Sequence, residues 1–237
     1  ILNQDTLSRI REKFSDPKVD ILGGEYDLEP ANPSVGTRFK SLMVASWRPR
    51  ENYVTVFLTR LGVIKKDIFV KSGGFDTNLT TASVEDYEFG RRLMASGHTM
   101  YYDENITVKH HFPSFKKQVK LFFQRAFMWM YAFEKCVKFD NTCTTPTQGL
   151  SQLCGFLAIL SLVLWPFNSA MGWASVVFLA IFVATNSRFF MLTLKNGGAS
   201  FAILSVLMAL VISCSIVLGA AWGAFYYFVY MRIKKKR

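Results

Sequence analysis

The sequence has 237 residues, a formal net charge of +11 and 51% hydrophobic residues. All 17 acidic residues and 21 of the 28 basic residues lie within residues 1–140, whereas residues 141–237 contain seven basic residues and no acidic one. A basic excess can indicate nucleic acid or a membrane surface, but the C-terminal half is apolar enough to enter a bilayer and no nucleic-acid motif occurs. We therefore expect an integral membrane protein with membrane lipid, and no nucleic acid, as a partner.

Residues 1–112 have the mixed pattern of an α/β domain. Apolar residues at helical spacing predict helices over residues 5–14 and 38–47. Short runs of β-formers predict strands over residues 18–28, 54–58, 99–102 and 106–109. We expect these elements to form one soluble domain with a mixed sheet.

A third helix is expected from Val84 to Ser96. Ser83-x-x-Asp86 resembles a capping box at its start, and Gly97 is a natural C-cap. Glu85 and Asp86 would then lie in the first turn, where the helix dipole stabilises carboxylates and keeps them ionised near neutral pH. Such a carboxylate can accept a proton from a sugar hydroxyl, although both residues can also be plain capping acids.

Residues 113–140 predict an amphipathic helix at the membrane surface. An apolar stripe begins at Phe115, and the opposite side carries Lys116, Lys117, Lys120 and Arg125. A helix of this kind can lie in the headgroup layer. The alternative is an ordinary helix packed on the soluble domain.

Residues 141–237 predict a transmembrane region with a basic cytoplasmic tail. Residues 141–187 and 196–231 contain no charge, and a breaker cluster interrupts the first run at residues 165–169. We expect spans near 150–167 and 173–193, and a third from Ala199 to at least Leu218. The tail at 232–237 and the loop with Arg188 and Lys195 should both be cytoplasmic. Three crossings cannot satisfy both, so either residues 219–231 begin a fourth crossing or one segment does not cross.

Several motifs follow one another in a fixed order between residues 59 and 111. They are Thr59-Arg60, Gly73-Gly74-Phe75-Asp76, Glu85-Asp86 and Val108-Lys109-His110-His111. This order resembles the family 2 glycosyltransferases, which have the GT-A fold, and the resemblance covers about residues 1–135. Leu61 stands where the family usually has Asn after Thr-Arg, which leaves the role of Thr59 and Arg60 open.

The resemblance implies roles for individual residues. Asp86 would be the base that deprotonates the acceptor hydroxyl, with Glu85 supporting it. The loop Gly73, Gly74, Phe75 and Asp76 would shape the sugar and acceptor pocket, and His110 would help to bind the metal or the diphosphate. Gln124, Arg125 and Trp129 are similar, with a different spacing, to the Q-x-x-R-W element of processive relatives.

The family binds its donor diphosphate through a divalent metal, Mg²⁺ or Mn²⁺, held by a D-x-D motif. No D-x-D occurs in this sequence, and Asp86-Tyr87-Glu88 is its nearest match. We therefore expect residue 1 to fall just after the place of that motif. The chain would then be a partial GT-A domain followed by an all-α transmembrane region, incomplete as it stands and lacking most of the donor site.

The expected function is inverting transfer of a sugar from a nucleotide-sugar donor to a hydroxyl of a glycolipid or polysaccharide. The catalytic part would lie on the cytoplasmic face of the cell membrane, in polysaccharide biosynthesis of the cell envelope. Two alternatives stay open: a polyprenyl-phosphate glycosyltransferase, and a non-catalytic membrane-anchored protein that binds a glycan or a partner. A transporter is disfavoured because the predicted spans contain no acidic residue.

Overall fold

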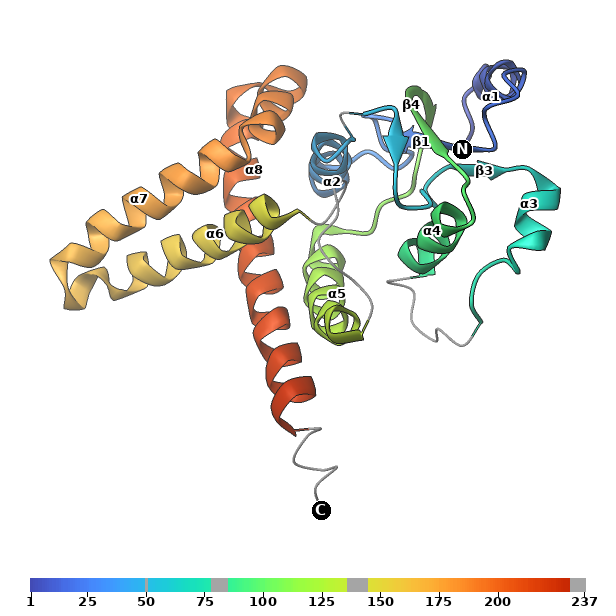
Figure 1. The fold of residues 1–237 in the computed structure, drawn as a ribbon. Coiled ribbons are helices and arrows are strands. Elements are labelled where there is room, and N and C mark those ends of the chain that lie inside the picture. The colour runs from blue at the N-terminus through green and yellow to red at the C-terminus, as the bar shows by residue number, and fades with distance from the viewer. Residues whose placement is uncertain (50, 78–84, 136–144, 231–237) are drawn as a thin grey trace. The chain divides into compact units, whose positions relative to one another are not determined.

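The fold was analysed in a computed structural model, which describes the chain except for residues 50, 78–84, 136–144 and 231–237, and except for the side chains of residues 131–135. The chain divides into two compact units (Figure 1). One is formed by Ile1–Phe112, and the other by Pro113–Lys135 together with the helices that follow residue 145.

The first unit is built on a small mixed sheet. Its strands are β1 (Ile21–Tyr26), β2 (Tyr53–Val54), β3 (Gly62–Ile64) and β4 (Met100–Val108), in the order β2-β4-β1-β3. β1 pairs with β4 in parallel and with β3 antiparallel, and β2 pairs antiparallel with β4. The register of β1 against β4 shifts between Gly23 and Glu25. The expected combination of a mixed sheet and helices is present, followed by helices alone.

Within the described residues of the first unit, four helices accompany the sheet. They are α1 (Thr6–Phe14), α2 (Val35–Ser46), α3 (Lys66–Lys71) and α4 (Glu85–Ala95). α2 begins with a capping box in which the backbone amide of Thr37 donates to the Ser34 hydroxyl and the Ser34 amide donates to the Thr37 hydroxyl. Such reciprocal bonds satisfy amide groups that the first helical turn leaves without partners.

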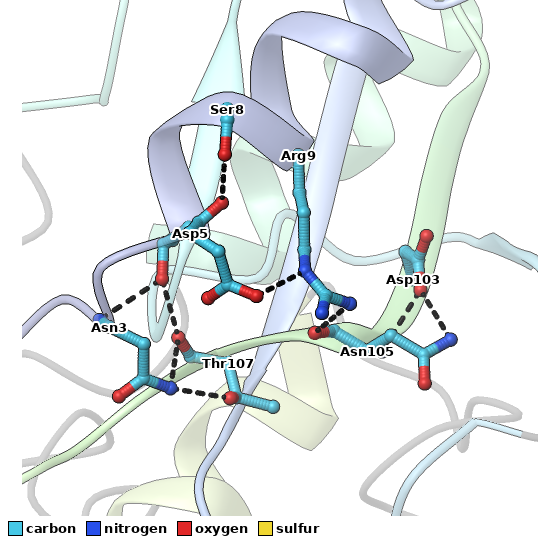
Figure 2. Close-up of polar contacts among 8 residues, drawn as sticks. Asn3, Asp5, Ser8, Arg9, Asp103, Asn105 and Thr107 are labelled. Atoms are coloured by element: carbon cyan, nitrogen blue, oxygen red, sulfur yellow. Dashed lines mark hydrogen bonds and ion pairs between the residues drawn. The ribbon is translucent and has the colours of Figure 1, made fainter.

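Figure 2 shows how the beginning of the chain is tied to β4. The Asn3 side chain donates to the Thr107 hydroxyl at 3.0 Å, and the Thr6 hydroxyl donates to the Thr107 carbonyl at 3.2 Å. Arg9 pairs with Asp5 one turn before it and also reaches the Asn105 carbonyl. These bonds hold α1 along β4, so the N-terminal segment is an integral part of the first unit.

Three of the predicted strands differ from the structure. Of the predicted strand 54–58, only Val54 lies in a strand, β2 (Tyr53–Val54). The buried residues after it leave the sheet because they pack beneath α4. There the Phe57 amide donates to the Asp86 carbonyl at 3.3 Å. The two strands expected at 99–102 and 106–109 form one strand, β4. β3 and α3 are additional elements, too short to give a periodic signal.

The second unit consists of helices. α5 (Phe115–Lys135) is followed by α6 (Pro146–Leu164), a 3₁₀ turn at Trp165–Phe167, α7 (Ser169–Thr185) and α8 (Ser187–Ala224), whose last turns continue as a π-helix at Phe225–Tyr230. α8 is sharply kinked at Gly198, whose φ of 74° is a left-handed conformation that favours glycine. Among the described residues, Pro146–Phe167 and Ser187–Tyr230 are long and apolar enough to cross a membrane, and α7 is shorter.

The predicted spans and the observed helices do not share all their boundaries. The second predicted span, 173–193, is interrupted at Asn186, whose side chain donates to the Ser151 hydroxyl and to the Phe182 carbonyl. Residues 219–230 continue α8 and do not begin a separate helix. The sequence leaves these boundaries open because apolar character is nearly uniform through the region.

Small and polar side chains form the contacts between these apolar helices. α6 and α7 are an antiparallel pair: the Ser175 hydroxyl donates to the Ala158 carbonyl, and the Thr185 and Ser151 hydroxyls bond near the other end. The large apolar residues of α6 face outward and are exposed: Leu150, Leu153, Leu160, Leu162, Val163 and Leu164. Such packing is typical of helices in lipid, where small residues allow close approach and hydrogen bonds join the helices.

Candidate active site

α4 holds Asp86 in a fixed position. The helix ends as predicted, because Gly97 has a φ of 82° and the His98 amide donates to the Leu93 carbonyl at 3.1 Å. Phe89 and Leu93 are fully buried, which fixes the orientation of the helix. Gly90 lets α4 approach the segment after β2, since a Cβ there would lie only 2.6 Å from the backbone nitrogen of Phe57. Ser83, the expected cap, lies outside the described residues.

The Asp86 carboxyl is a stronger base than an ordinary aspartate. Burial, and then the neighbouring charge of Glu85, raise the pKa of Asp86 to about 6, although the Tyr87 amide donates to its carboxylate and Arg60 attracts its charge. The expected effect of the helix dipole is therefore outweighed, since desolvation dominates at this position. With such a pKa the group is still ~90% ionised at pH 7, so the expected ionised state is retained.

Arg60 lies in a buried polar cluster with Glu25 and Tyr102. Its Nη1 donates to both carboxylate oxygens of Glu25, at 2.7 and 2.9 Å, and the Tyr102 hydroxyl donates to Oε2 of the same carboxylate at 3.1 Å. The Glu25 side chain has no exposed surface, and the Arg60 side chain is 9% exposed. A buried charge is tolerated only when it is paired and hydrogen-bonded, and Glu25 meets both conditions.

Tyr102 is a neutral member of this cluster, and Arg48 borders it. Burial, reinforced by the nearby Glu25 charge, raises the pKa of the Tyr102 hydroxyl far above its ordinary value, so Tyr102 stays a neutral donor. Arg48 donates to the Tyr26 carbonyl at 3.0 Å, and its charge also acts on Tyr102. The end of β1 is therefore lined by two guanidinium groups and one buried carboxylate.

The loop Gly73-Gly74-Phe75-Asp76 has a clear structural role. Gly73 and Gly74 have φ of 77° and 65° and end α3, with the Gly74 amide donating to the Phe69 carbonyl at 3.1 Å. Phe75 packs against Phe57 and Phe89 in the aromatic core beneath α4. Gly73 and Gly74 thus terminate α3, and Phe75 fills the core beneath α4. These residues are needed for the fold, whatever function the loop has.

Arg92 joins this loop to α4. Its guanidinium pairs with Glu88 one turn earlier and donates to the carbonyls of Ser72 and Gly74. Because Glu88 is bound in this way, Asp86-Tyr87-Glu88 does not present two carboxylates to one metal ion. Arg92 instead fixes the distance between the glycine loop and the start of α4.

His110 is packed between aromatic rings. Its ring stacks on Tyr26 at a centroid distance of 4.7 Å and meets Phe112 edge-on at 5.0 Å. Burial, aided by the neighbouring His111, lowers the pKa of His110, which favours its neutral imidazole. A neutral imidazole can bind a metal, but within the described parts of the chain no group of three or more His, Cys, Asp or Glu residues could hold one.

The remaining predicted site residues are spread over both units. Thr59 is exposed, and Leu61, which replaces the family's usual Asn, packs over Gly24 and donates no side-chain hydrogen bond. Gln124 and Arg125 are exposed and Trp129 is half-buried on α5, which belongs to the second unit. The structure thus brings Arg60, which is bound to Glu25, within electrostatic range of Asp86.

Glu25 and Tyr102 are not among the residues that the motifs predict. Glu25 is the one charged residue in the strand Ile-Leu-Gly-Gly-Glu-Tyr, and a lone charge in an apolar strand is a signal that could have drawn attention to it. Tyr102 and Arg92 give no comparable local signal.

The arrangement is suited to proton transfer next to fixed positive charge. Asp86 can accept a proton near neutral pH, and Arg60 supplies a guanidinium that is oriented by Glu25. Comparison with known proteins gave no match: no protein-family model, no curated protein and no solved structure corresponds to this chain.

Proposed function

We propose that the chain is the membrane-anchored second half of a glycosyltransferase that moves a sugar from a nucleotide donor to a hydroxyl acceptor. The observation that carries this proposal is the position of Asp86, whose pKa of about 6 suits a general base at neutral pH. The ordered motifs that resemble family 2 glycosyltransferases support the same assignment.

In this mechanism Asp86 accepts the proton of the acceptor hydroxyl as its oxygen attacks the anomeric carbon from the side opposite the nucleotide. Glu85 raises the basicity of Asp86 through its negative charge. Arg60 is oriented by Glu25 and its charge acts on Asp86, so it would help to stabilise negative charge that develops on the acceptor oxygen beside that carboxylate. A divalent metal bound by a D-x-D motif of a preceding segment would neutralise the leaving diphosphate, and His110 is this chain's candidate contact to it.

The apolar helices support a place in the membrane. α6 and α8 are long enough to cross a bilayer and turn large apolar side chains outward. We infer that the acceptor is lipid-linked or a growing polysaccharide, and that the first unit faces the cytoplasm, where nucleotide sugars are made.

The test is a transfer assay on the full-length protein in membranes, with a panel of radiolabelled nucleotide sugars and lipid or polysaccharide acceptors. Asp86→Asn should lower kcat ~10²–10⁴-fold, the usual contribution of a positioned base, and leave donor binding almost unchanged. Asp67→Asn, which removes an exposed carboxylate from the first turn of α3, is the matched control. Full activity of Asp86→Asn with a lipid-phosphate acceptor would favour the polyprenyl-phosphate alternative, and no transfer with any donor would favour a binding protein.

A further inference from the structure

The segment that follows β2 connects the buried carboxylate of β1 with the start of α4. The Phe57 amide of this segment donates to the Asp86 carbonyl at 3.3 Å, which ties the segment to the first turn of α4. At the other end of the segment, the Leu61 carbonyl accepts from the Gly24 amide at 2.8 Å, one residue before Glu25. Glu25 and Asp86 are far apart in the chain, but both border this one short segment.

Close packing holds the same segment on β1. A Cβ at Gly23 would lie 2.7 Å from Cδ1 of Leu58, and a Cβ at Gly24 would lie 2.4 Å from Cδ2 of Leu61. Because both glycines lack a side chain, the two leucines can pack directly on the strand. The backbone of Arg60 lies between these leucines and is therefore held close to β1.

Glu25 is itself held from two sides. Its Oε2 accepts from the Tyr102 hydroxyl at 3.1 Å and its Oε1 accepts from the Tyr26 amide at 2.8 Å, while both oxygens accept from Nη1 of Arg60. The Glu25 side chain is fully buried and that of Arg60 nearly so, which limits the screening of their charges by salt. The strand thus fixes the position of the guanidinium and neutralises part of its charge.

Arg60 carries the electrostatic influence of this pair to Asp86. Burial raises the pKa of Asp86, the neighbouring charge of Glu85 raises it further, and the charge of Arg60 lowers it. The other charged side chains of α4 and of the loop before it act on one another or are exposed: Glu88, Arg92, Asp76 and Arg91. The strength of the attraction between Arg60 and Asp86 therefore depends on how much of the guanidinium charge Glu25 neutralises.

We propose that Glu25 is a positioning residue for the proposed sugar transfer and acts on the base, Asp86, through Arg60. By holding the guanidinium on β1 and neutralising part of its charge, Glu25 limits how strongly Arg60 attracts the Asp86 carboxylate. Asp86 thereby stays basic enough to take the proton of the acceptor hydroxyl, instead of becoming a permanently ionised partner of the arginine. The role in transfer rests on the proposed function, whereas the coupling of the three side chains does not.

The sign of the effect follows from the charges. Neutralising Glu25 alone leaves the whole guanidinium charge acting on Asp86, so the pKa of Asp86 should fall by roughly one pH unit, the lower end of the effect of a nearby opposite charge. Neutralising both Glu25 and Arg60 removes the attraction, so the pKa of Asp86 should rise above its wild-type value of about 6.

The test measures the pKa of Asp86 directly by isotope-edited infrared spectroscopy, which distinguishes a protonated carboxyl group from a carboxylate. Carbon-labelled aspartate is incorporated into the full chain in detergent, and the Asp86 band is the one that Asp86→Asn removes in each background. E25Q should titrate at lower pH than the wild type, and E25Q/R60Q at higher pH. E25D keeps the negative charge and should titrate close to the wild type.

Y102F is the matched control within the same cluster. It removes the hydroxyl that donates to Glu25 but keeps both charges, so it should leave the pKa of Asp86 nearly unchanged. Melting temperatures show which variants fold. E25Q leaves the Arg60 charge buried without its counterion and can unfold the first unit. In that case E25Q/R60Q, which removes both charges together, decides the outcome.

A wild-type pKa of Asp86 in folded E25Q or in folded E25Q/R60Q would refute the coupling. An equal shift in Y102F would also overturn it, since disturbed packing and not charge would then be responsible. In the full-length enzyme the rising limb of kcat/KM should move together with the infrared pKa, and a limb that stays fixed while the pKa moves would refute the positioning role. A shifted pKa without any sugar transfer would instead reject the proposed function and leave the coupling intact.

Discussion

Arg60 is held by Glu25, a residue 35 positions earlier in the chain, through bonds of 2.7 and 2.9 Å from one guanidinium nitrogen to both carboxylate oxygens. Glu25 is in turn bound by the Tyr102 hydroxyl and by the Tyr26 amide. Arg60 belongs to the motifs, but Glu25 and Tyr102, which hold it in position, do not. If Arg60 serves the reaction, Glu25 is a positioning residue for it.

Glu25→Gln should destabilise the first unit strongly. The substitution keeps the size of the side chain but leaves the Arg60 charge buried without its counterion, which typically costs about 3–5 kcal/mol. We expect faster amide hydrogen exchange throughout β1 and β4 in the detergent-solubilised chain. Glu29→Gln is the control, because Glu29 is 67% exposed and its contact with Lys109 is 3.6 Å long. Equal exchange in the two variants would contradict a tightly coupled buried pair.

Glu85→Gln should shift the pH dependence of transfer by the full-length enzyme. Transfer needs ionised Asp86, so kcat/KM should rise with pH through about 6 in the wild type. Removing the like charge of Glu85 lowers the pKa of Asp86, and the rising limb should move to lower pH. Burial remains, so the limb should stay above the ordinary aspartate range. A limb that does not move would mean that another group controls the profile.

Asp86→Asn should stabilise the chain at neutral pH, although it removes the proposed base. The folded pKa of about 6 lies above the ordinary value of 3.8, so ionised Asp86 destabilises the fold above pH 6. The penalty shrinks as the pH falls through 6 and is absent below the unfolded value. We expect a gain of about 1–3 kcal/mol at pH 7.5 and almost none at pH 3.5. Thermal unfolding at the two pH values measures this, and a destabilised variant at pH 7.5 would contradict the raised pKa.

Gly219→Leu should separate α5 from α8. Any side chain at this position overlaps the Phe123 carbonyl, and backbone cannot move aside without opening the helix contact. A loss of several degrees in the melting temperature in detergent is expected, the usual result of overpacking. Ala221→Leu adds similar volume at an exposed position of the same helix and should have little effect. Equal melting temperatures of the two variants would argue against the close contact.

Asn105 offers a test of which side of the membrane the first unit occupies. Asn105-Ile106-Thr107 is a glycosylation sequon, and Asn105 is exposed on β4. If the unit faces the cytoplasm, as proposed, the protein expressed in a eukaryotic host should carry no glycan at this residue. Mass spectrometry of the peptide provides the measurement. A glycan on Asn105 would place the unit on the opposite side.

The sequence by itself predicts the features that depend on neighbouring residues. Acidic residues are confined to residues 1–140, so the apolar helices fall in the second part of the chain. The end of α4 follows from Gly97 and its burial from Phe89 and Leu93, since helix caps and helical spacing are local properties. α1 and α2 were predictable for the same reason.

Only the tertiary structure decides what Asp86 and Arg60 can do and how α5 packs on α8. The parallel pairing of β1 with β4 brings Tyr102 to Glu25 across 77 residues, and the packing of α4 over the segment after β2 partly buries Asp86. Desolvation and ion pairing depend on distances through space, which a linear pattern does not contain. The small residues of α8 similarly determine, from 96 residues away, which side of α5 remains exposed.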